Sequence, residues 1–143
     1  NLRKHGIESH AFIMVGFPDE TEKTFKETID FIPKLKPDSV IFSIFTPYPG
    51  SDLYYQCKDS GIISDDFDLS LYNHQSPLNC FTKNISKERF YELREAAVKF
   101  VDSYNTKAKF KRGIRSLKNI GILATMKKVI KYIYSKILSY REA

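Results

Sequence analysis

The most constraining feature of this sequence is an apolar run that ends in a stiff, acidic loop. The run Phe12–Val15 leads directly into the loop Gly16–Thr21. A continuous apolar run predicts a strand, about Ala11 to Val15, that is buried on both faces, as in a parallel sheet. Within the loop, Gly16 allows a tight turn or a close approach to a ligand, and Pro18 stiffens the chain.

A helix and a second strand are predicted next. Asp19, with Glu22 three residues later, has the spacing of a helix start. The helix is expected over about Glu20 to Leu35, where apolar residues recur at helical spacing: Phe25, Ile29, Ile32 and Leu35. The segment Ser39–Phe45 predicts another strand buried on both faces. Strand, helix and strand together predict a parallel, right-handed βαβ unit.

The second strand also ends in a rigid loop, Thr46-Pro47-Tyr48-Pro49-Gly50-Ser51. Adjacent parallel strands would place both loops side by side at the edge where α/β proteins bind ligands. Their backbone groups could contact a nucleotide-like ligand, or they could be ordinary βα turns. Glu20 could accept a hydrogen bond from an amine or a ribose hydroxyl, or it could favour the helix N-terminus through the helix dipole.

The remainder of the chain predicts mainly helices. Ser51 is expected to cap a short helix, Asp52–Lys58, and residues 62–82 are expected to be irregular. Further on, the sequence predicts a long helix, about Lys87–Lys107, a basic connector over 107–118, and an amphipathic last helix, about 122–140. The predicted organisation is therefore 1–62, an α/β part; 63–106, an irregular loop and a long helix; and 107–143, a basic amphipathic helical tail.

Charge is distributed unevenly along the chain. Residues 1–106 carry 12 Lys or Arg and 16 Asp or Glu, whereas residues 107–143 carry 11 Lys or Arg and one acidic residue, Glu142. The tail could pack on the rest of the protein, lie on an anionic membrane surface, or contact nucleic acid. Nucleic acid is the least favoured of the three because no reader motif is present.

The two cysteines, Cys57 and Cys80, are isolated in the sequence and lack the spacing of a metal site. Unpaired cysteines of this kind are typical of a reducing compartment, so a cytoplasmic location is expected. No apolar run approaches the roughly 20 residues of a membrane span, and nothing resembles a signal peptide.

These motifs together resemble part of a radical SAM enzyme. Phe12-Ile13-Met14-Val15-Gly16-Phe17-Pro18-Asp19-Glu20-Thr21, followed by Thr28-Ile29-Asp30-Phe31, resembles the fifth-strand segment of that family. Ser43-Ile44-Phe45-Thr46-Pro47-Tyr48-Pro49-Gly50-Ser51-Asp52-Leu53-Tyr54 resembles the sixth strand and its loop. Leu2-Arg3-Lys4-His5-Gly6-Ile7 resembles the end of the preceding helix. The pattern is closest to the branch with a cobalamin-binding domain, which includes magnesium-protoporphyrin cyclase-like proteins. Asp19 departs from the glycine that is usual there.

The resemblance implies the fold and the cofactors of that family. The fold would be the C-terminal portion of a partial, TIM-like (β/α)₆ barrel, represented by two parallel strands with a crossover helix and followed by an α-helical extension. A 4Fe–4S cluster on a Cys-x₃-Cys-x₂-Cys loop would cleave S-adenosylmethionine (SAM) to a 5′-deoxyadenosyl radical. That loop is absent from this sequence, and Cys57 and Cys80 cannot replace it. The expected partner is therefore an upstream part of the same polypeptide that carries the cluster.

The resemblance also assigns candidate site residues. Val15 and Gly16 would contact the adenosine of SAM, and Pro18 and Glu20 would shape the loop. Three residues that follow the second strand would border SAM or a small-molecule substrate: Thr46, Pro47 and Tyr48. The substrate, the type of reaction and the use of cobalamin stay open. The alternative function is a stand-alone α/β interaction module whose basic amphipathic helix docks on a membrane or on nucleic acid.

Overall fold

The computed structural model describes residues 2–73, 76, 78–120, 126–127 and 130. The chain divides into two compact units, residues 1–105 and 106–143. Each unit is described by itself below.

The first unit is built on the predicted βαβ arrangement. After a short 3₁₀ helix, η1 (Leu2–His5), the chain forms β1 (His10–Val15), α1 (Glu22–Leu35) and β2 (Ser39–Ile44). The two strands pair in parallel, in a register that places Phe12 beside Ile41 and Val15 beside Ile44. The prediction of two parallel strands joined by a crossover helix is therefore confirmed.

The helix α1 begins two residues later than predicted. Thr21, and not Asp19, is its N-cap residue: the Thr21 hydroxyl accepts a hydrogen bond from Thr24 N at 3.2 Å, and Thr24 Oγ1 accepts one from Thr21 N at 2.9 Å. This reciprocal capping box satisfies two backbone donors that the first turn would otherwise leave without partners. Glu20 consequently belongs to the loop and not to the helix.

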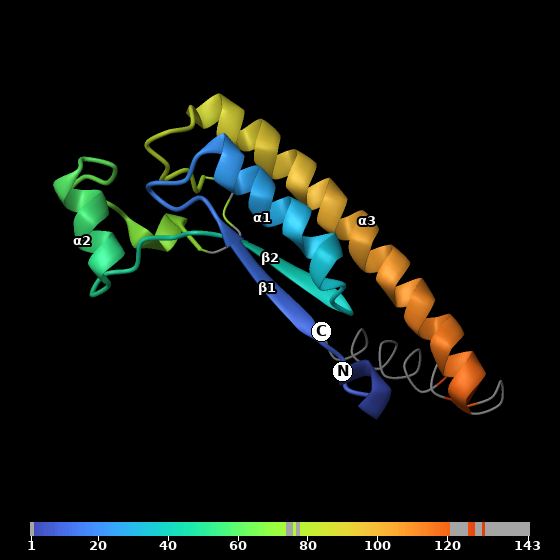
Figure 1. Cartoon of the computed structure of the whole chain (residues 1–143). Helices are drawn as coiled ribbons and strands as arrows, with labels where there is room; N and C mark the ends of the chain where they lie inside the picture. The colour runs from blue at the N-terminus through green and yellow to red at the C-terminus, as the bar shows by residue number, and fades with distance from the viewer. Residues whose placement is uncertain (1, 74–75, 77, 121–125, 128–129, 131–143) are drawn as a thin grey trace. The chain divides into compact units, whose positions relative to one another are not determined.

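Helices cover one face of the sheet. Figure 1 shows α1 and the first turns of α3 (Lys87–Ile120) along the same side of β1 and β2. Alternate strand residues point toward these helices, among them Val15, Val40 and Ile44, and the residues between them point away. The expectation that both strands are buried on both faces is therefore wrong for the described residues, which cover one face only.

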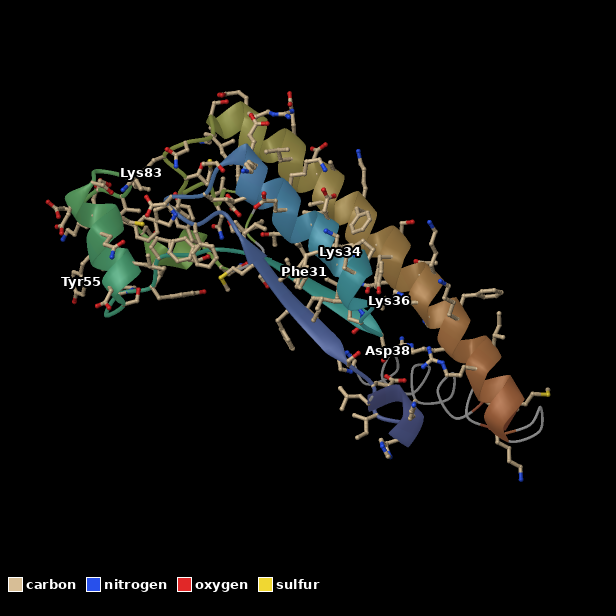
Figure 2. The ribbon with its side chains drawn as sticks, in the orientation of Figure 1. Phe31, Lys34, Lys36, Asp38, Tyr55 and Lys83 are labelled. Atoms are coloured by element: carbon tan, nitrogen blue, oxygen red, sulfur yellow. The ribbon has the colours of Figure 1, made fainter. Side chains whose placement is uncertain are left out.

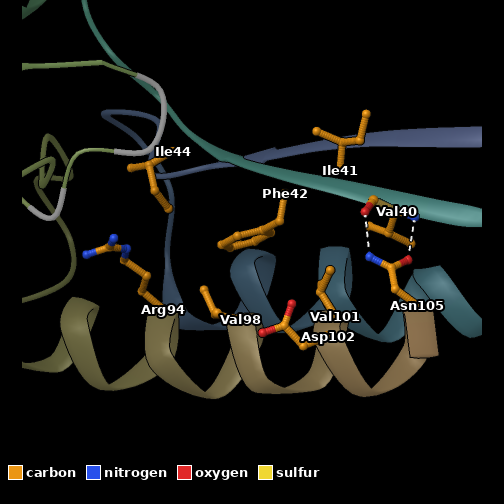
Figure 3. Close-up of a pocket in the computed structure, with 9 residues that line it drawn as sticks. All are labelled: Val40, Ile41, Phe42, Ile44, Arg94, Val98, Val101, Asp102 and Asn105. Atoms are coloured by element: carbon orange, nitrogen blue, oxygen red, sulfur yellow. Dashed lines mark hydrogen bonds between the residues drawn. The ribbon is translucent and has the colours of Figure 1, made fainter. Parts of the chain in front are cut away.

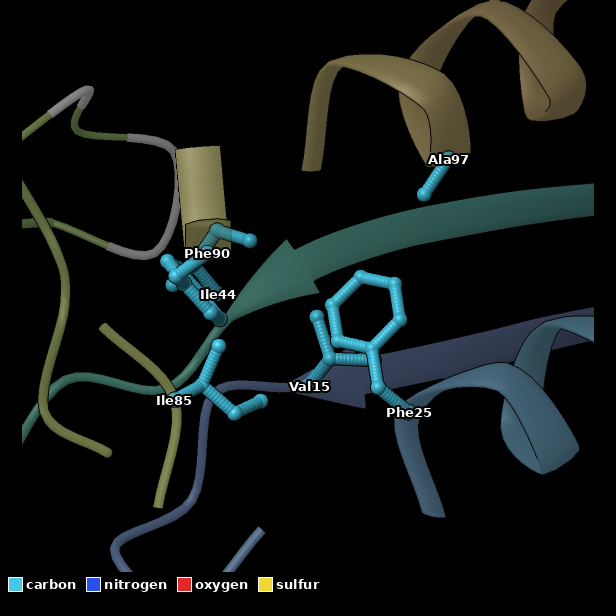
Figure 4. Packing of buried hydrophobic residues seen from close by; sticks show 6 residues of the cluster. All are labelled: Val15, Phe25, Ile44, Ile85, Phe90 and Ala97. Atoms are coloured by element: carbon cyan, nitrogen blue, oxygen red, sulfur yellow. The ribbon is translucent and has the colours of Figure 1, made fainter. Parts of the chain in front are cut away.

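The core between the sheet and the helices is aromatic and aliphatic (Figure 4). Phe90 is fully buried and meets Phe25 edge to face, with ring centroids 6.1 Å apart. The other residues of this cluster are Val15, Ile44, Ile85 and Ala97. Burying one such side chain is worth about 1.5–3 kcal/mol, so Phe90 contributes substantially to holding α3 against the strand ends.

A second cluster forms beside the strand ends. The helix α2 (Asp52–Asp59) begins at Ser51, whose hydroxyl accepts a hydrogen bond from Tyr54 N at 3.2 Å, as predicted. Its buried Cys57 packs with Phe45, Ile63 and Phe81. The segment that follows is irregular except for a short 3₁₀ helix, η2 (Leu69–Leu71). Aromatic packing of Phe67, Tyr72 and Phe81 therefore holds the described part of this irregular segment.

The helix α3 is longer than predicted. It continues to Ile120, so the basic stretch 107–118 is helical and is not a connector. Every residue in that stretch except Gly113 is compatible with a helix, and the lysines and arginines are good helix formers. The last helix predicted over 122–140 lies almost wholly outside the described residues. Within the described part of the chain, no helix is long and apolar enough to cross a membrane.

Candidate functional site at the strand ends

The two loops that follow β1 and β2 lie together, as their sequence positions predicted. Phe45 N donates a hydrogen bond to Val15 O at 2.8 Å, which extends the strand pairing into both loops. The Phe17 and Phe45 rings stack with centroids 5.0 Å apart. The carboxyl ends of the strands therefore form one surface built from two rigid segments, the position at which open α/β sheets bind ligands.

Gly16 allows the first loop to turn away from the sheet. Its φ is +89°, a conformation that other residues adopt only with strain. A Cβ atom at Gly16 would lie 3.0 Å from Phe90 Cζ and 3.3 Å from Ile44 Cγ2. The glycine is therefore required both by the turn and by its close packing against Phe90. This packing contact is a reason that the sequence alone did not indicate.

Glu20 is directed back into its own loop. Its carboxylate accepts a short hydrogen bond from Gly16 N and is also bonded by the backbone of Phe17. Burial raises the pKa of Glu20, and the two backbone donors oppose that increase only in part. Since the side chain is buried and already bonded, its position supports a role in shaping the loop more than one in contacting a ligand.

The first loop is also held from outside. Lys83 N donates to Pro18 O at 2.8 Å, and Asn84 Nδ2 donates to Asp19 O at 3.0 Å. The Lys83 ammonium lies 3.7 Å from the Asp19 carboxylate. Pro18 is buried in this arrangement. The segment that precedes α3 therefore holds the first loop in place. This is the loop in which Asp19 stands where the similar sequences usually have glycine.

Of the three predicted site residues in the second loop, two are buried and one is exposed. Thr46 and Pro47 are buried, whereas Tyr48 is 47% exposed. Ser51 closes the loop, because its hydroxyl donates to Tyr48 O at 2.8 Å. The structure therefore brings Thr46, Pro47 and Tyr48 to the same edge as Gly16, and among these three only Tyr48 presents its side chain at the surface.

Val15 lies at this edge as well, but its side chain points into the helix-covered core and is fully buried. Its carbonyl oxygen is occupied by Phe45 N. Val15 would therefore contribute to a ligand site as a structural support behind the loop.

Asn79 is a buried polar residue near the site that sequence reasoning missed. Its Nδ2 donates to Thr46 Oγ1 at 2.7 Å and to Asn73 O at 2.6 Å. Asn79 lies 33 positions from Thr46, in a segment without periodicity, so no sequence signal marks the contact. It fixes the orientation of the Thr46 side chain.

The face of the sheet opposite the helices is open, and its central residues are apolar. Phe12 is 76% exposed, and Met14 and Ile41 are also exposed. Phe12 stands directly beside Ile41 in the strand register. The continuous apolar run of β1 concealed this face, whereas β2 carries Ser39 and Ser43 on the same side as Ile41, the partial alternation of a half-exposed strand.

A cavity of about 460 Å³ lies at the outer edge of β2, between the strand and α3 (Figure 3). Its walls combine apolar residues with Arg94, Asp102 and Asn105. It flanks the strand and not the two loops, so it is separate from the surface at the strand ends.

The cysteines do not form a metal site in the described residues. Cys57 is buried and Cys80 partly buried, both as free thiols. Burial raises the pKa of each thiol, which disfavours the thiolate that metals bind. Within the described ranges, no three His, Cys, Asp or Glu residues gather as metal ligands.

Comparisons with known proteins give significant similarities. The chain is 39% identical over 59 residues to a bacteriochlorophyllide d C-12(1)-methyltransferase of Chlorobaculum tepidum, which is 41% of this chain and 13% of that protein. It is 32% identical over 77 residues to an anaerobic magnesium-protoporphyrin IX monomethyl ester cyclase of Rubrivivax gelatinosus, 54% of this chain and 13% of that protein.

A longer match is to a tRNA-2-methylthio-N(6)-dimethylallyladenosine synthase of Buchnera aphidicola. It is 28% identical over 109 residues, 73% of this chain and 23% of that protein. The chain therefore spans less than a quarter of the length of each of these relatives. No family model matches the chain, and no solved structure matches it.

The fold and the candidate site define a class: an α/β protein in which two parallel strands end at one edge, the position at which open α/β sheets bind ligands. The comparisons then indicate the family. The chain is similar over part of its length to radical SAM enzymes, among them a magnesium-protoporphyrin cyclase, bacteriochlorophyllide methyltransferases and tRNA methylthiotransferases. The resemblance predicted from the two loop motifs is thereby confirmed.

Proposed function

We propose that this chain forms the fifth and sixth strands of a partial (β/α)₆ barrel in a radical SAM enzyme, where it helps to bind SAM and a small-molecule substrate. The observation that carries the proposal is the open sheet face, on which Phe12, Met14 and Ile41 are exposed and which leads directly to the two rigid loops. A barrel has its helices outside and its ligands at the carboxyl ends of the strands, and α1 and α3 cover only one face here. The open face would then be the barrel interior.

Features beside β1 support the proposal that the partner is an upstream part of the same polypeptide. A hollow of about 540 Å³ lies along Ile13 and α1, and Phe31 beside it is 51% exposed (Figure 2). An exposed aromatic side chain such as Phe31 beside a hollow favours contact with another element. A two-stranded sheet is also marginal without further strands, so the upstream strands would pair at the edge of β1.

The chemistry of the donor set fits SAM but not the cluster. The Thr46 hydroxyl, the Tyr48 ring and the backbone of both loops provide polar and aromatic groups of the kind that a nucleoside requires. Two free thiols whose pKa burial raises do not fit a 4Fe–4S cluster, whose ligands would come from the upstream part. When bound with the cluster, SAM supplies a 5′-deoxyadenosyl radical or a methyl group. Cobalamin, as in the B12-binding relatives, is the further proposed cofactor.

The residues of this chain would orient the ligand and exclude water. Gly16 and Glu20 hold the first loop in its turn, Pro18 and Pro47 stiffen the two loops, and Thr46 offers its hydroxyl. Behind them, the buried core around Val15 excludes water. Rigid positioning is what the protein contributes when a cofactor carries the chemistry.

The test uses the intact gene product, purified anaerobically. Phe12→Asp places a charge in the proposed interior and is expected to reduce SAM binding at least ~10-fold, since an unpaired buried charge is strongly unfavourable. Phe110→Asp is the matched control, because Phe110 is similarly exposed, at 71%, on the later part of α3. Equal SAM affinity in both variants and the wild type, or an intact gene product without an upstream Cys-x₃-Cys-x₂-Cys segment, would refute the proposal.

A second candidate function concerns the basic tail. Phe110 and Ile114 are exposed on a helical segment rich in lysine and arginine, the pattern of a helix that lies on an anionic membrane surface. Such a contact would be peripheral and on the cytoplasmic side, and nucleic acid is the less favoured partner. Co-sedimentation with anionic vesicles, but not with neutral ones, would support it. Unchanged sedimentation after deletion of residues 107–143 would refute it.

A further inference from the structure

The buried amide of Asn79 is only half satisfied. The side chain is 0% exposed, and both of its donors are used, one by Thr46 Oγ1 and one by Asn73 O. Its acceptor, Oδ1, has no hydrogen-bond partner among the residues that the structure describes. Buried polar atoms in folded proteins are nearly always bonded, so an acceptor of this kind indicates a group that binds there.

The orientation of this amide is fixed by its neighbours. Asn73 O is a carbonyl oxygen and can only accept, so the atom that faces it at 2.6 Å must be the nitrogen. Exchanging Nδ2 and Oδ1 would place two acceptors against each other. The unpartnered atom is therefore an oxygen, and it needs a donor.

Thr46 supplies the complementary group. Its Oγ1 accepts from Asn79 Nδ2, which leaves the hydroxyl proton to be donated elsewhere, and no described residue accepts it. Thr46 is 6% exposed, and it follows β2 by two residues, at the edge of the proposed ligand site. The Thr46 hydroxyl is bonded to Asn79 Nδ2, which belongs to the same amide as Oδ1. The hydroxyl and Oδ1 are therefore separated by at most the length of one hydrogen bond plus the width of the amide group. A single water molecule or polar group can bridge that gap.

We propose that the Thr46 hydroxyl and Asn79 Oδ1 form a buried subsite for one group that both donates and accepts a hydrogen bond. The group is either an ordered water or a polar edge of the ligand, such as an amino group beside a ring nitrogen. Asn79 is then a positioning residue, because it directs the Thr46 hydroxyl proton outward while Oδ1 receives the donor. The subsite lies within the proposed SAM and substrate site. The identity of its ligand rests on the proposed function, whereas the existence of the subsite does not.

Crystal structures of the intact protein, free and with SAM, test the subsite directly. A water within hydrogen-bond distance of both atoms in the two states supports it with water as the occupant. A water that SAM displaces, or a ligand atom on Oδ1, supports it with the ligand as the occupant. An Oδ1 atom that stays without a partner in both structures, or one turned toward a residue of the protein itself, overturns it.

Variants separate positioning from mere stability. Thr46→Val removes the hydroxyl at nearly constant volume and is expected to weaken SAM binding ~5- to 10-fold, whereas Thr46→Ser is expected to restore it to within about twofold. Thr28→Val, on α1, is the control, since the Thr28 hydroxyl donates to Thr24 O within its own helix. If Thr46→Val and Thr28→Val bind SAM with equal affinity, the subsite contacts SAM neither directly nor through an ordered water.

Failure of the subsite can be distinguished from failure of the proposed function. A wild-type protein that binds no SAM refutes that function, while the structure of the free protein still decides whether Oδ1 and the hydroxyl hold a water. Asn79→Ala is a less useful variant, because it also removes the bond to Asn73 O that orders the segment before α3.

Discussion

Asn105 binds both outward-facing backbone groups of Val40 with the two ends of its side-chain amide. Its Oδ1 accepts from Val40 N at 2.8 Å, and its Nδ2 donates to Val40 O at 2.9 Å (Figure 3). The amide thus takes the place that a neighbouring strand would have at the edge of β2. Unpaired strand edges are templates for association, so this contact favours β2 as the protected edge of the sheet and β1 as the edge that extends.

Replacing Asn105 tests this edge protection. Asn105→Leu removes both hydrogen bonds and leaves the Val40 groups without partners, so the free energy of unfolding should fall by about 1–3 kcal/mol. The variant should also self-associate more readily, as measured by light scattering at increasing concentration. Lys99→Leu, on the exposed surface of the same helix, should stay within about 0.5 kcal/mol of the wild type. Equal stability and association in the two variants would contradict the assignment.

Gly16 and Gly50 form a matched pair for the turn in the first loop. Both have a φ near +90°, but of the two only Gly16 has neighbours within 4 Å of the position that a Cβ atom would occupy, at Phe90 and Ile44. Gly50→Ala should cost about 1–2 kcal/mol from backbone strain. Gly16→Ala should cost that amount and about 1–3 kcal/mol more from overpacking. Urea denaturation measures both, and equal losses would show that Phe90 can move aside.

The sequence was sufficient for the local architecture. The βαβ unit, the parallel pairing and the Ser51 cap follow from apolar runs and from residues that are close in sequence. It was not sufficient for contacts between distant residues. Asn105 reaches Val40 across 65 positions, and Asn79 reaches Thr46 across 33, from segments whose pattern assigns them no partner.

The open sheet face shows a second limit of sequence reasoning. Phe12 and Ile41 are as apolar as the buried residues beside them, so composition cannot distinguish a strand packed on both faces from one whose second face is open.

Among the predicted site residues, Glu20 differs most from its sequence-based interpretation. Its burial and its bonds to its own loop were not visible in the spacing that suggested a ligand contact or a helix cap. Whether these residues bind SAM stays a prediction.

The contact between α1 and α3 should weaken in acid. Arg89 Nε and Nη2 each donate to Glu22 Oε2 at 2.9 Å, and this bonding lowers the pKa of Glu22 below its usual 4.5. A lowered pKa contributes stability that is present above the unfolded value and is lost as the pH falls through the folded one. The stability difference between the wild type and Arg89→Leu should therefore shrink below about pH 4.5. Lys99→Leu is the control, and the same shrinkage in both variants would contradict this cause.

Glu20 should have the opposite pH dependence. Its pKa is raised above the usual 4.5 by burial, although the backbone of Gly16 and Phe17 bonds the carboxylate. A raised pKa means that the folded protein binds the proton more tightly, so this contribution to stability is complete below the unfolded pKa and is lost as the pH rises through the folded pKa. Glu20→Gln keeps an acceptor for Gly16 N and does not ionise. The stability of the wild type relative to Glu20→Gln should therefore decrease as the pH is raised from about 4 toward 7, as measured by urea denaturation at each pH. A relative stability that increases with pH would show that the backbone donors outweigh burial, and that the loop holds Glu20 as a stabilised carboxylate.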